Sequence, residues 1–214
     1  LLLSKYSPAV FCLQETFLKA TDTNISFKQY SLFNYIENNA ERAAGGSSIL
    51  VHNRIPHSKV DLDTPLQAVA VQVTLHKAIT ICSVYLTPNK KIKKEELENL
   101  IKQLPEPFIL LGDLNGHSPL WGCSSTNDRG KQIETLIEKH DICLMNDKSY
   151  TYLHPATGHF SSLDLSLCSP SLFLDYDFKV HDDLCGSDHF PTILTNTETS
   201  ISDQIPRWKF SKAD

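Results

Sequence analysis

The stretch Phe108-Ile109-Leu110-Leu111-Gly112-Asp113-Leu114-Asn115-Gly116-His117 decides how the rest of the chain is interpreted. Its four leading apolar residues predict a short strand that is buried on both faces. The apolar run ends at Gly112, where a glycine allows the backbone to turn sharply or another group to approach closely. Asp113 and Asn115 follow, and if the strand continues as far as Asn115 their side chains point to the same side.

A carboxylate and an amide that project together from a strand end are well placed for chemistry, because a packed strand holds its terminal side chains still. The competing interpretation is that residues 113–116 form only a turn, since Asp, Asn and Gly are common in turns. This stretch alone does not separate the two interpretations. The rest of the chain has to decide between them.

The bulk composition indicates one ordinary globular domain. The chain has 214 residues, of which 41% are hydrophobic and 21% charged, and a chain of this size buries roughly 70% of the surface of its unfolded form. No apolar run approaches the ~20 residues that cross a bilayer, so no membrane partner is expected. The formal net charge of −5 is mild evidence against a surface that binds nucleic acid tightly by itself.

The cysteines and the start of the chain carry further expectations. The six cysteines, at positions 12, 82, 123, 143, 168 and 185, include no C-x-x-C pair. We therefore expect buried free thiols in a reducing compartment and neither a disulfide framework nor a zinc site. The chain begins without Met and has no basic n-region or long apolar h-region, so we do not interpret its start as a signal peptide. We expect it to be a piece of a longer protein.

Hydrophobic patterning predicts an α+β fold. Amphipathic spacing predicts helices over 93–104 and 128–140, with the end of another over 1–6. Apolar and alternating runs predict short strands at 10–13, 29–35, 47–52, 69–75, 78–85, 108–111, 142–145, 151–153, 163–168, 178–181 and 191–195. Because these elements do not alternate as βαβα, we predict two mainly antiparallel sheets packed face to face and flanked by helices. Residues 1–195 form the predicted domain and 196–214 a polar C-terminal linker.

Several polar residues lie at or just beyond the ends of the predicted strands. They are Glu15, Tyr85, Asp113, Asn115, Asp164, Asp188 and His189. In a two-sheet sandwich the loops at one end of the strands converge, so these side chains predict a site for a hard divalent cation with oxygen ligands. Each of them taken alone is more often a turn residue or a solvated charge.

Five short motifs in a fixed order make the interpretation specific. They are Cys12-Leu13-Gln14-Glu15-Thr16, Val84-Tyr85-Leu86-Thr87-Pro88, Gly112-Asp113-Leu114-Asn115, Ser162-Leu163-Asp164 and Gly186-Ser187-Asp188-His189. With them the chain resembles the endonuclease/exonuclease/phosphatase superfamily, whose members have the four-layer, DNase I-like sandwich fold. A single G-D-x-N motif is weak evidence, whereas five ordered motifs that span nearly the whole chain are strong evidence.

Two further segments narrow the resemblance. Residues 116–122 and Asn127-Asp128-Arg129-Gly130 resemble the apurinic-type endonuclease domain of non-LTR (LINE-type, jockey-like) retrotransposons. The sequence departs from the family in lacking the usual first strand, which carries a metal-binding Asn, so we expect the activity of the chain to depend on that strand. A smaller departure is Leu114, where the family often has Phe.

The resemblance implies a Mg²⁺ ion, with Mn²⁺ as the alternative, near Glu15 and Asp188. It implies that Asp113 orients or deprotonates the attacking water, with Asn115 beside it. Asp188 is assigned to the metal or to that water. Tyr85 is expected to contact the phosphate.

The resemblance also assigns the remaining residues. His189 is expected to contact the scissile phosphate, and Asp164 to pair with His189 and keep it charged by raising its pKa. Two weaker assignments, His117 and Ser187, concern contacts with the substrate. Trp121 belongs to the same segment as His117 and is expected to be packed in the interior.

The leading hypothesis is a metal-dependent DNA endonuclease. It nicks target DNA in the nucleus to give a 3′-hydroxyl primer for a reverse transcriptase domain that lies downstream. One alternative is another enzyme of the superfamily, acting on abasic DNA, inositol phosphates or lipid phosphodiesters. The other is a catalytically impaired or domesticated form that serves as a binding module.

Overall fold

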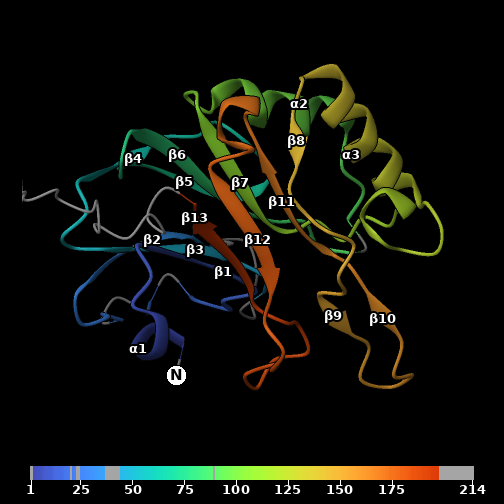
Figure 1. Ribbon diagram of the computed structural model, residues 1–214, viewed down its shortest axis with the longest axis horizontal. Helices are drawn as coiled ribbons and strands as arrows, with labels where there is room; N and C mark the ends of the chain where they lie inside the picture. The colour runs from blue at the N-terminus through green and yellow to red at the C-terminus, as the bar shows by residue number, and fades with distance from the viewer. Residues whose placement is uncertain (1, 20, 23–24, 37–43, 89, 198–214) are drawn as a thin grey trace, which may run out of the picture.

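The computed structural model describes residues 2–19, 21–22, 25–36, 44–88 and 90–197 (Figure 1). The helices are α1 (Leu2–Tyr6), α2 (Lys94–Gln103) and α3 (Asp128–Lys139), with short 3₁₀ turns η1 (Pro119–Trp121) and η2 (Pro170–Leu172). The strands are β1 (Val10–Gln14), β2 (Tyr30–Tyr35), β3 (Ser47–His52), β4 (His57–Val60), β5 (Gln67–Thr74), β6 (Ala78–Tyr85), β7 (Phe108–Asp113), β8 (Cys143–Leu144), β9 (Tyr152–Leu153), β10 (Phe160–Ser161), β11 (Asp164–Cys168), β12 (Tyr176–Val180) and β13 (Thr192–Asn196).

The central sheet has six strands in the order β4-β5-β6-β7-β11-β8. The short connection between the predicted strands 69–75 and 78–85 makes them a hairpin: β5 and β6 pair antiparallel from Thr74 and Ala78 at its turn to Gln67 and Tyr85 at its open end. Strand β7 pairs parallel with β6, and α2 provides the crossover that a parallel connection needs. The other pairings in the sheet are antiparallel, as predicted for most of the fold.

A second layer of strands packs on one face of the central sheet. It consists of the three-stranded sheet β1-β3-β2 and the two-stranded sheet β12-β13. Ile49 of β3 belongs to the same apolar cluster as Val71 of β5 and Ile81 of β6, and Phe178 and Leu194 pack against that cluster from β12 and β13. The predicted face-to-face sandwich is therefore confirmed.

Helices α2 and α3 cover the opposite face of the central sheet (Figure 1). Leu100 of α2 and Ile133 of α3 are fully buried, and they share an apolar cluster with Val84, Leu110 and Leu167 of the sheet. The helix spacing read from the sequence thus points the apolar faces of both helices at the sheet. Helix α1 lies on the outer side of the second layer in Figure 1, which gives four layers.

The interior between the two strand layers becomes polar toward one end. There, Gln14 of β1 donates to the hydroxyl of Ser83 on β6 over 2.8 Å, and the hydroxyl of Ser47 on β3 lies 2.8 Å from the same oxygen. Ser47 and Ser83 are fully buried, so their hydrogen bonds satisfy groups that water does not reach. This polar end of the sandwich is where the carboxylates singled out in the sequence lie.

A glycine is needed at position 112 because the neighbouring strand packs closely there, and not because the chain turns. Gly112 is part of β7 and pairs with Val84 of β6. A Cβ atom added at Gly112 would lie 1.9 Å from the carbonyl oxygen of Val84, and the φ angle of Gly112 is +156°. Of the two roles predicted for this glycine, close approach is therefore the one found.

This geometry predicts a large loss of stability for Gly112→Ala. We expect the free energy of unfolding to fall by about 3 kcal/mol, because the methyl group forces β6 and β7 apart. The control is Gly158→Ala, since Gly158 has φ +68° and nothing within 4 Å of an added Cβ, and it should lose only about 1 kcal/mol. Urea unfolding of both variants checks the difference, and equal losses would contradict the packing argument.

Several sequence-based expectations need correction. Strand β4 was not predicted, because His57–Val60 is largely polar and lies at the edge of the central sheet. Strand β7 ends at Asp113 and does not extend to Asn115, whose φ of +49° is left-handed. Asn196, assigned to the linker, belongs to β13, and residues 198–214 of that predicted linker lie outside the described residues.

The structure shows unpaired cysteines, as expected, and half of them are buried. All six cysteines are free thiols; Cys82, Cys123 and Cys168 are buried and the other three are partly buried. Over the described ranges, no helix is both long and apolar enough to cross a membrane.

Candidate active site

Three of the predicted residues form a row across the central sheet. Tyr85 of β6 is in register with Asp113 of β7, and Asp113 is in register with Asp164 of β11. In-register residues on neighbouring strands point to the same face of the sheet. Ile81 and Ile109, each four residues earlier on its strand, belong to the cluster between the layers, so the row faces the second layer.

Glu15 meets this row from the opposite layer. It directly follows β1, and the hydroxyl of Tyr85 donates a hydrogen bond to its carboxylate. Its φ of +51° is left-handed, which turns the chain away as β1 ends. Burial raises the pKa of the Tyr85 hydroxyl first, and the hydrogen bond and the charge of Glu15 raise it further. Tyr85 therefore stays protonated and acts as a donor that holds the Glu15 carboxylate.

His189 and Asp164 form a direct pair. The Nδ1 atom of His189 lies 2.8 Å from Oδ2 of Asp164, and both side chains are largely buried. Burial lowers the pKa of His189, but the hydrogen bond and charge of Asp164, with the charges of Asp113 and Asp188, outweigh it and raise the pKa to about 9. The imidazole is therefore a cation near neutral pH that donates Nδ1–H to Asp164.

Asp113 is the most buried carboxylate of the group, with 4% of its surface exposed. Burial is the largest effect on its pKa and raises it, and the negative charges of Asp164 and Glu15 raise it further. The positive charge of His189 and the hydrogen bond from the backbone of Asn115 lower it. Together these effects bring the pKa of Asp113 to about 7. Such a carboxylate can exchange a proton near neutral pH, which is what a base for an attacking water requires.

Asn115 reaches Asp113 by a route that strand alternation did not predict. Its backbone N–H donates to Oδ1 of Asp113 over 3.0 Å, and its side-chain amide donates to Oδ2 over 2.7 Å. The first bond is that of a turn closed by an Asp side chain. The chain therefore turns at Asn115, and the turn itself brings the Asn115 amide to the Asp113 carboxylate.

The remaining predicted residues differ in how they relate to the site. Asp188 is exposed, but its charge acts on His189. Ser187 is exposed and its hydroxyl accepts from the backbone N–H of His189 over 3.1 Å, so it shapes the loop that carries the imidazole. The hydrogen bonds that the structure describes for His117 involve its backbone, toward Asn127.

One residue of the site was not singled out from the sequence. The ring of Tyr152 lies 4.7 Å from that of His189, centre to centre, and the two residues form an isolated β-bridge. Burial raises the pKa of the Tyr152 hydroxyl, and the charges of Asp188, Asp113 and Glu15 raise it further. We call the whole set the polar cluster: Glu15, Tyr85, Asp113, Asn115, Tyr152, Asp164, Asp188 and His189.

Comparison with known proteins decides the family. A family profile described as endonuclease-reverse transcriptase matches residues 79–193, which is more than half of the chain. The chain belongs to the endonuclease-reverse transcriptase family. The matched stretch includes every residue of the polar cluster except Glu15.

Two curated proteins, each an RNA-directed DNA polymerase of a mobile element, are similar to the chain. A probable RNA-directed DNA polymerase from transposon X-element of Drosophila melanogaster is 26% identical over 202 residues, covering 90% of this chain and 22% of that protein. An RNA-directed DNA polymerase from mobile element jockey of Drosophila funebris is 27% identical over 160 residues, covering 70% of this chain and 17% of that protein. The chain thus spans about a fifth of their length, and the resemblance expected from the motifs is confirmed.

Two solved structures confirm the DNase I-like fold. The endonuclease domain of TRAS1, a telomere-specific non-LTR retrotransposon, superposes with a TM-score of 0.74 at 20% identity and covers 91% of this chain and 89% of that one. The AP endonuclease LMAP from Leishmania major gives 0.70 at 14% identity, covering 91% and 80%. The predicted α+β sandwich with four layers is therefore the fold of this endonuclease-reverse transcriptase family member.

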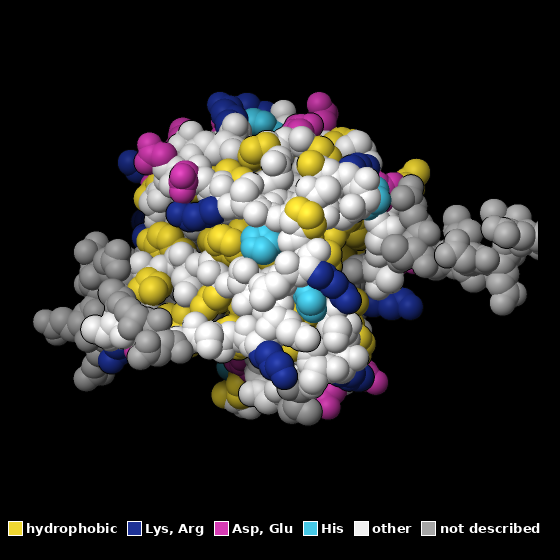
Figure 2. Space-filling view, turned by 90° about the vertical axis from the view of Figure 1, so that its left-hand side faces the viewer, with side chains coloured by type: hydrophobic (Ala, Val, Ile, Leu, Met, Phe, Trp, Pro, Cys, Tyr) yellow, Lys and Arg dark blue, Asp and Glu magenta, His cyan; other side chains and the backbone are white. Residues whose placement is uncertain are grey.

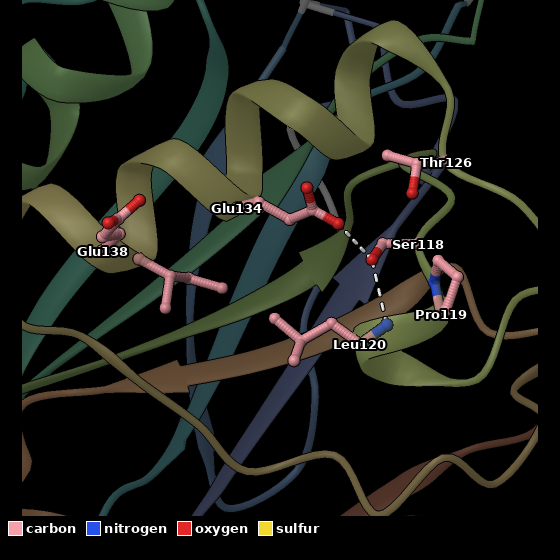
Figure 3. Close-up of a pocket in the computed structure, with 7 residues that line it drawn as sticks. Ser118, Pro119, Leu120, Thr126, Glu134 and Glu138 are labelled. Carbon is pink, nitrogen blue, oxygen red and sulfur yellow. Dashed lines mark hydrogen bonds between the residues drawn. The ribbon is translucent and has the colours of Figure 1, made fainter.

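A cavity of about 550 Å³ lies apart from the polar cluster, between η1 and α3 (Figure 3). Figure 3 shows Ser118 between Glu134 and Leu120; its hydroxyl donates to Glu134 and accepts from the backbone N–H of Leu120. Trp121 of the same segment is fully buried, as predicted, and donates to the carbonyl of Gly116 over 3.0 Å. Part of the segment after Asn115 is thus held by the buried Trp121 and by the hydrogen bonds of Ser118.

Proposed function

We propose that the chain is a metal-dependent DNA endonuclease domain that nicks target DNA to leave a 3′-hydroxyl, from which a downstream reverse transcriptase primes in the nucleus. The observation that carries this proposal is the pair of His189 and Asp164, which adjoins Asp113 and Asn115 and faces Glu15. This set supplies what phosphodiester hydrolysis requires: a base for water, a cation beside the phosphate and a carboxylate for a divalent metal.

In the proposed mechanism, Asp113 takes the proton of the attacking water. Both of its oxygens already accept hydrogen bonds from Asn115, which fixes the plane of the carboxylate. The Oδ1 atom of Asn115 remains available to accept a hydrogen bond from that water, because its Nδ2 donates to Asp113 and to the Leu86 carbonyl. Fixed donors and acceptors of this kind avoid reorganisation during the reaction.

His189 provides the positive charge at the phosphate. With Nδ1–H donated to Asp164, the Nε2–H of the imidazolium is the donor for a non-bridging phosphate oxygen. Asp164 sets the orientation of the ring, and Tyr152 packs against it from the neighbouring segment. A cationic donor aimed at an oxygen that gains charge in the transition state stabilises that state more than the ground state.

The polar cluster fits a hard divalent cation. Its carboxylates, Glu15, Asp113, Asp164 and Asp188, outnumber its one cationic imidazole, and their mutual repulsion contributes to the raised pKa of Asp113. Within the part of the chain that the structure describes, no three His, Cys, Asp or Glu side chains are grouped to hold an ion. In the proposed site, Mg²⁺ would be bound by one or two carboxylates, with water completing its coordination. We assign Glu15 as the protein ligand, with Asp188 nearby; the ion would neutralise charge on the phosphate and the leaving oxygen.

The surface around the polar cluster offers aromatic contacts to DNA. Tyr150 and Phe160 are exposed and stacked, with ring centres 5.7 Å apart, and Phe160 is stacked in turn on Phe190 at 6.3 Å. Phe190 directly follows His189, so this stack borders the reactive side chains. Phenyl rings cannot hydrogen-bond to base edges. We therefore expect groove shape and DNA deformability to govern the choice of target site.

The net charge of the chain predicts that this domain alone binds DNA weakly. The side of the molecule drawn in Figure 2, which is the left-hand side of Figure 1 and not the side that carries β9 and β10, has Lys and Arg side chains scattered among uncharged and hydrophobic surface. The net charge of the whole chain is −5. We therefore expect the affinity for duplex DNA to be low and to fall steeply with salt. The rest of the protein would supply much of the affinity.

Metal removal tests the proposed chemistry. We expect the purified chain, or a version extended by the strand expected ahead of Leu1, to convert supercoiled plasmid to the nicked form with Mg²⁺ or Mn²⁺. EDTA should reduce this conversion to background, and added Mg²⁺ should restore it, because the carboxylates alone leave the phosphate charge uncompensated. Nicking that persists in EDTA would contradict the metal assignment, and no nicking by either version would contradict the nuclease function.

The chemistry of the ends tests the priming role. We expect the nicked plasmid to be extended directly by a DNA polymerase, since attack on phosphorus with the 3′-oxygen leaving gives a 3′-hydroxyl. The measurement is incorporation of labelled nucleotide with and without prior phosphatase treatment. Incorporation that depends on phosphatase would reveal 3′-phosphate ends and would overturn the priming role while leaving the nuclease function intact.

A further inference from the structure

Arg129 is a half-buried cation that hydrogen-bonds to backbone carbonyls. It lies in the first turn of α3, within the segment Asn127-Asp128-Arg129-Gly130. Its Nη1 donates to the carbonyl of Leu86 over 2.9 Å and to that of Thr87 over 3.1 Å, and its Nη2 donates to the carbonyl of Lys90 over 2.5 Å. A planar guanidinium can make all three bonds at once, which a lysine ammonium at the same place cannot reproduce.

The Leu86 peptide groups connect Arg129 to the polar cluster. The backbone N–H of Leu86 donates to the carbonyl of Asp113 over 2.9 Å. The carbonyl of Leu86 accepts from Nδ2 of Asn115 over 3.2 Å and from Arg129. Nδ2 of Asn115 also donates to the carboxylate of Asp113 over 2.7 Å. The position of one carbonyl oxygen therefore helps set the rotation of the Asn115 amide.

The first turn of α3 is itself held firmly against the segment after Asn115. The side-chain oxygen of Asn127 accepts from the backbone N–H of Gly130 over 2.7 Å and from that of His117 over 3.0 Å. A Cβ added at Gly130 would lie 1.8 Å from the carbonyl oxygen of His117, so the helix can seat this closely only with glycine there. Arg129 thus extends from a fixed point toward Leu86.

We propose that Arg129 is a positioning residue that acts through the Leu86 carbonyl to hold the Asn115 amide against the Asp113 carboxylate. The proposal rests on the nuclease function proposed above for the same cluster. It gives the Asn127–Gly130 segment a role: Asn127 and Gly130 seat the helix, and Arg129 transmits its position to the reactive side chains. Arg129 touches none of the reacting atoms in this scheme.

The test compares Arg129→Lys with Arg54→Lys, since Arg54 is an exposed arginine outside this network. In the full chain we expect Arg129→Lys to shift or broaden the NMR signals of the Asn115 side-chain amide, which Asn115→Ala identifies by their loss. We also expect it to lower the kcat for nicking by about 10- to 100-fold with KM little changed. Arg54→Lys should change neither.

A double-mutant cycle adds a readout that a purely structural role would not move. If Arg129 acts through Asn115, adding Arg129→Lys to Asn115→Ala should lower the residual rate little further, because the two effects are not additive. Thermal unfolding of each variant checks whether the protein remains folded, and Arg129→Gln provides a second substitution if Arg129→Lys does not fold.

The outcomes separate this inference from the proposed function. Unchanged Asn115 amide signals in Arg129→Lys overturn the inference whether or not the protein nicks DNA. A raised KM with unchanged kcat, or additive effects in the cycle, overturns the positioning role as well. If the wild type does not nick DNA, the proposed function fails and the catalytic role fails with it, while the amide signals still decide whether Arg129 positions Asn115.

Discussion

Replacing Asp113 with asparagine is expected to lower the rate of DNA nicking about 10³-fold, the size of effect seen when a general base is removed. Asparagine matches the carboxylate in size and can still accept a hydrogen bond from the backbone N–H of Asn115, which donates to Oδ1 over 3.0 Å. Its amide nitrogen replaces Oδ2, which accepts from Nδ2 of Asn115 over 2.7 Å, so that one hydrogen bond is lost. It carries no negative charge and cannot take a proton from water. The rate should be measured under single-turnover conditions on end-labelled duplex DNA.

The same substitution should change the stability of the protein little, because the relieved charge offsets the hydrogen bond lost from Nδ2 of Asn115. Asp113 is in register with Asp164 on the neighbouring strand and is 4% exposed, so its charge is both desolvated and beside a like charge. Removing that charge relieves both costs, as expected where a site favours activity over stability.

Asp177→Asn is the matched control for Asp113→Asn. Asp177 is an exposed carboxylate on β12, and its loss should affect neither the nicking rate nor the melting temperature. Near-full activity in Asp113→Asn would contradict the proposed mechanism. A loss of activity accompanied by a large fall in melting temperature would instead show that Asp113 serves the fold.

Replacing His189 with alanine is expected to lower the nicking rate about 10²- to 10³-fold, because a fixed donor to the developing phosphate charge is lost. The variant also leaves Asp164 without the Nδ1 partner that lies 2.8 Å away, which places another unpaired negative charge beside the substrate phosphate. Because the imidazolium acts mainly on charge that develops in the transition state, the rate should fall more than the affinity for DNA does. Gel-shift titration at low salt measures that affinity.

His159→Ala is the control for His189→Ala. His159 is an exposed histidine between β9 and β10, close in the sequence to Tyr152 but outside the polar cluster. We expect its substitution to leave the rate unchanged. Equal rates for His189→Ala and the wild type would exclude the proposed role of the imidazole.

Much of the fold follows from local patterning. The run from Phe108 to Leu111 predicts a strand with both faces covered, and the structure covers it with helices on one side and a second strand layer on the other. Strand β4 escaped prediction because His57–Val60 is polar and partly exposed, so it has no hydrophobic pattern; it joins the central sheet by antiparallel pairing with β5. The parallel pairing of β6 and β7 follows from the helical crossover, a tertiary feature.

The sequence indicated most residues of the candidate site, but it did not indicate how they are brought together in space. Asp113 and Asn115 were singled out by an argument from strand alternation, but the structure unites them through a left-handed residue and a turn. Tyr152 carries no signal in the sequence, because it lies in a short strand and meets His189 only through a bridge formed on folding. Arg129 lies in a segment whose family character was noted, yet its contacts with Leu86 depend on tertiary packing.

The most direct test of the central claim is plasmid nicking by wild-type protein and by Asp113→Asn, purified in parallel and assayed with Mg²⁺. The catalytic role of the polar cluster predicts that the wild type produces nicked circles at a rate proportional to protein concentration. It predicts that Asp113→Asn, which keeps the fold, produces them at the background rate. Equal nicking by the two preparations, or none above background in the wild type carrying the strand expected ahead of Leu1, would contradict it.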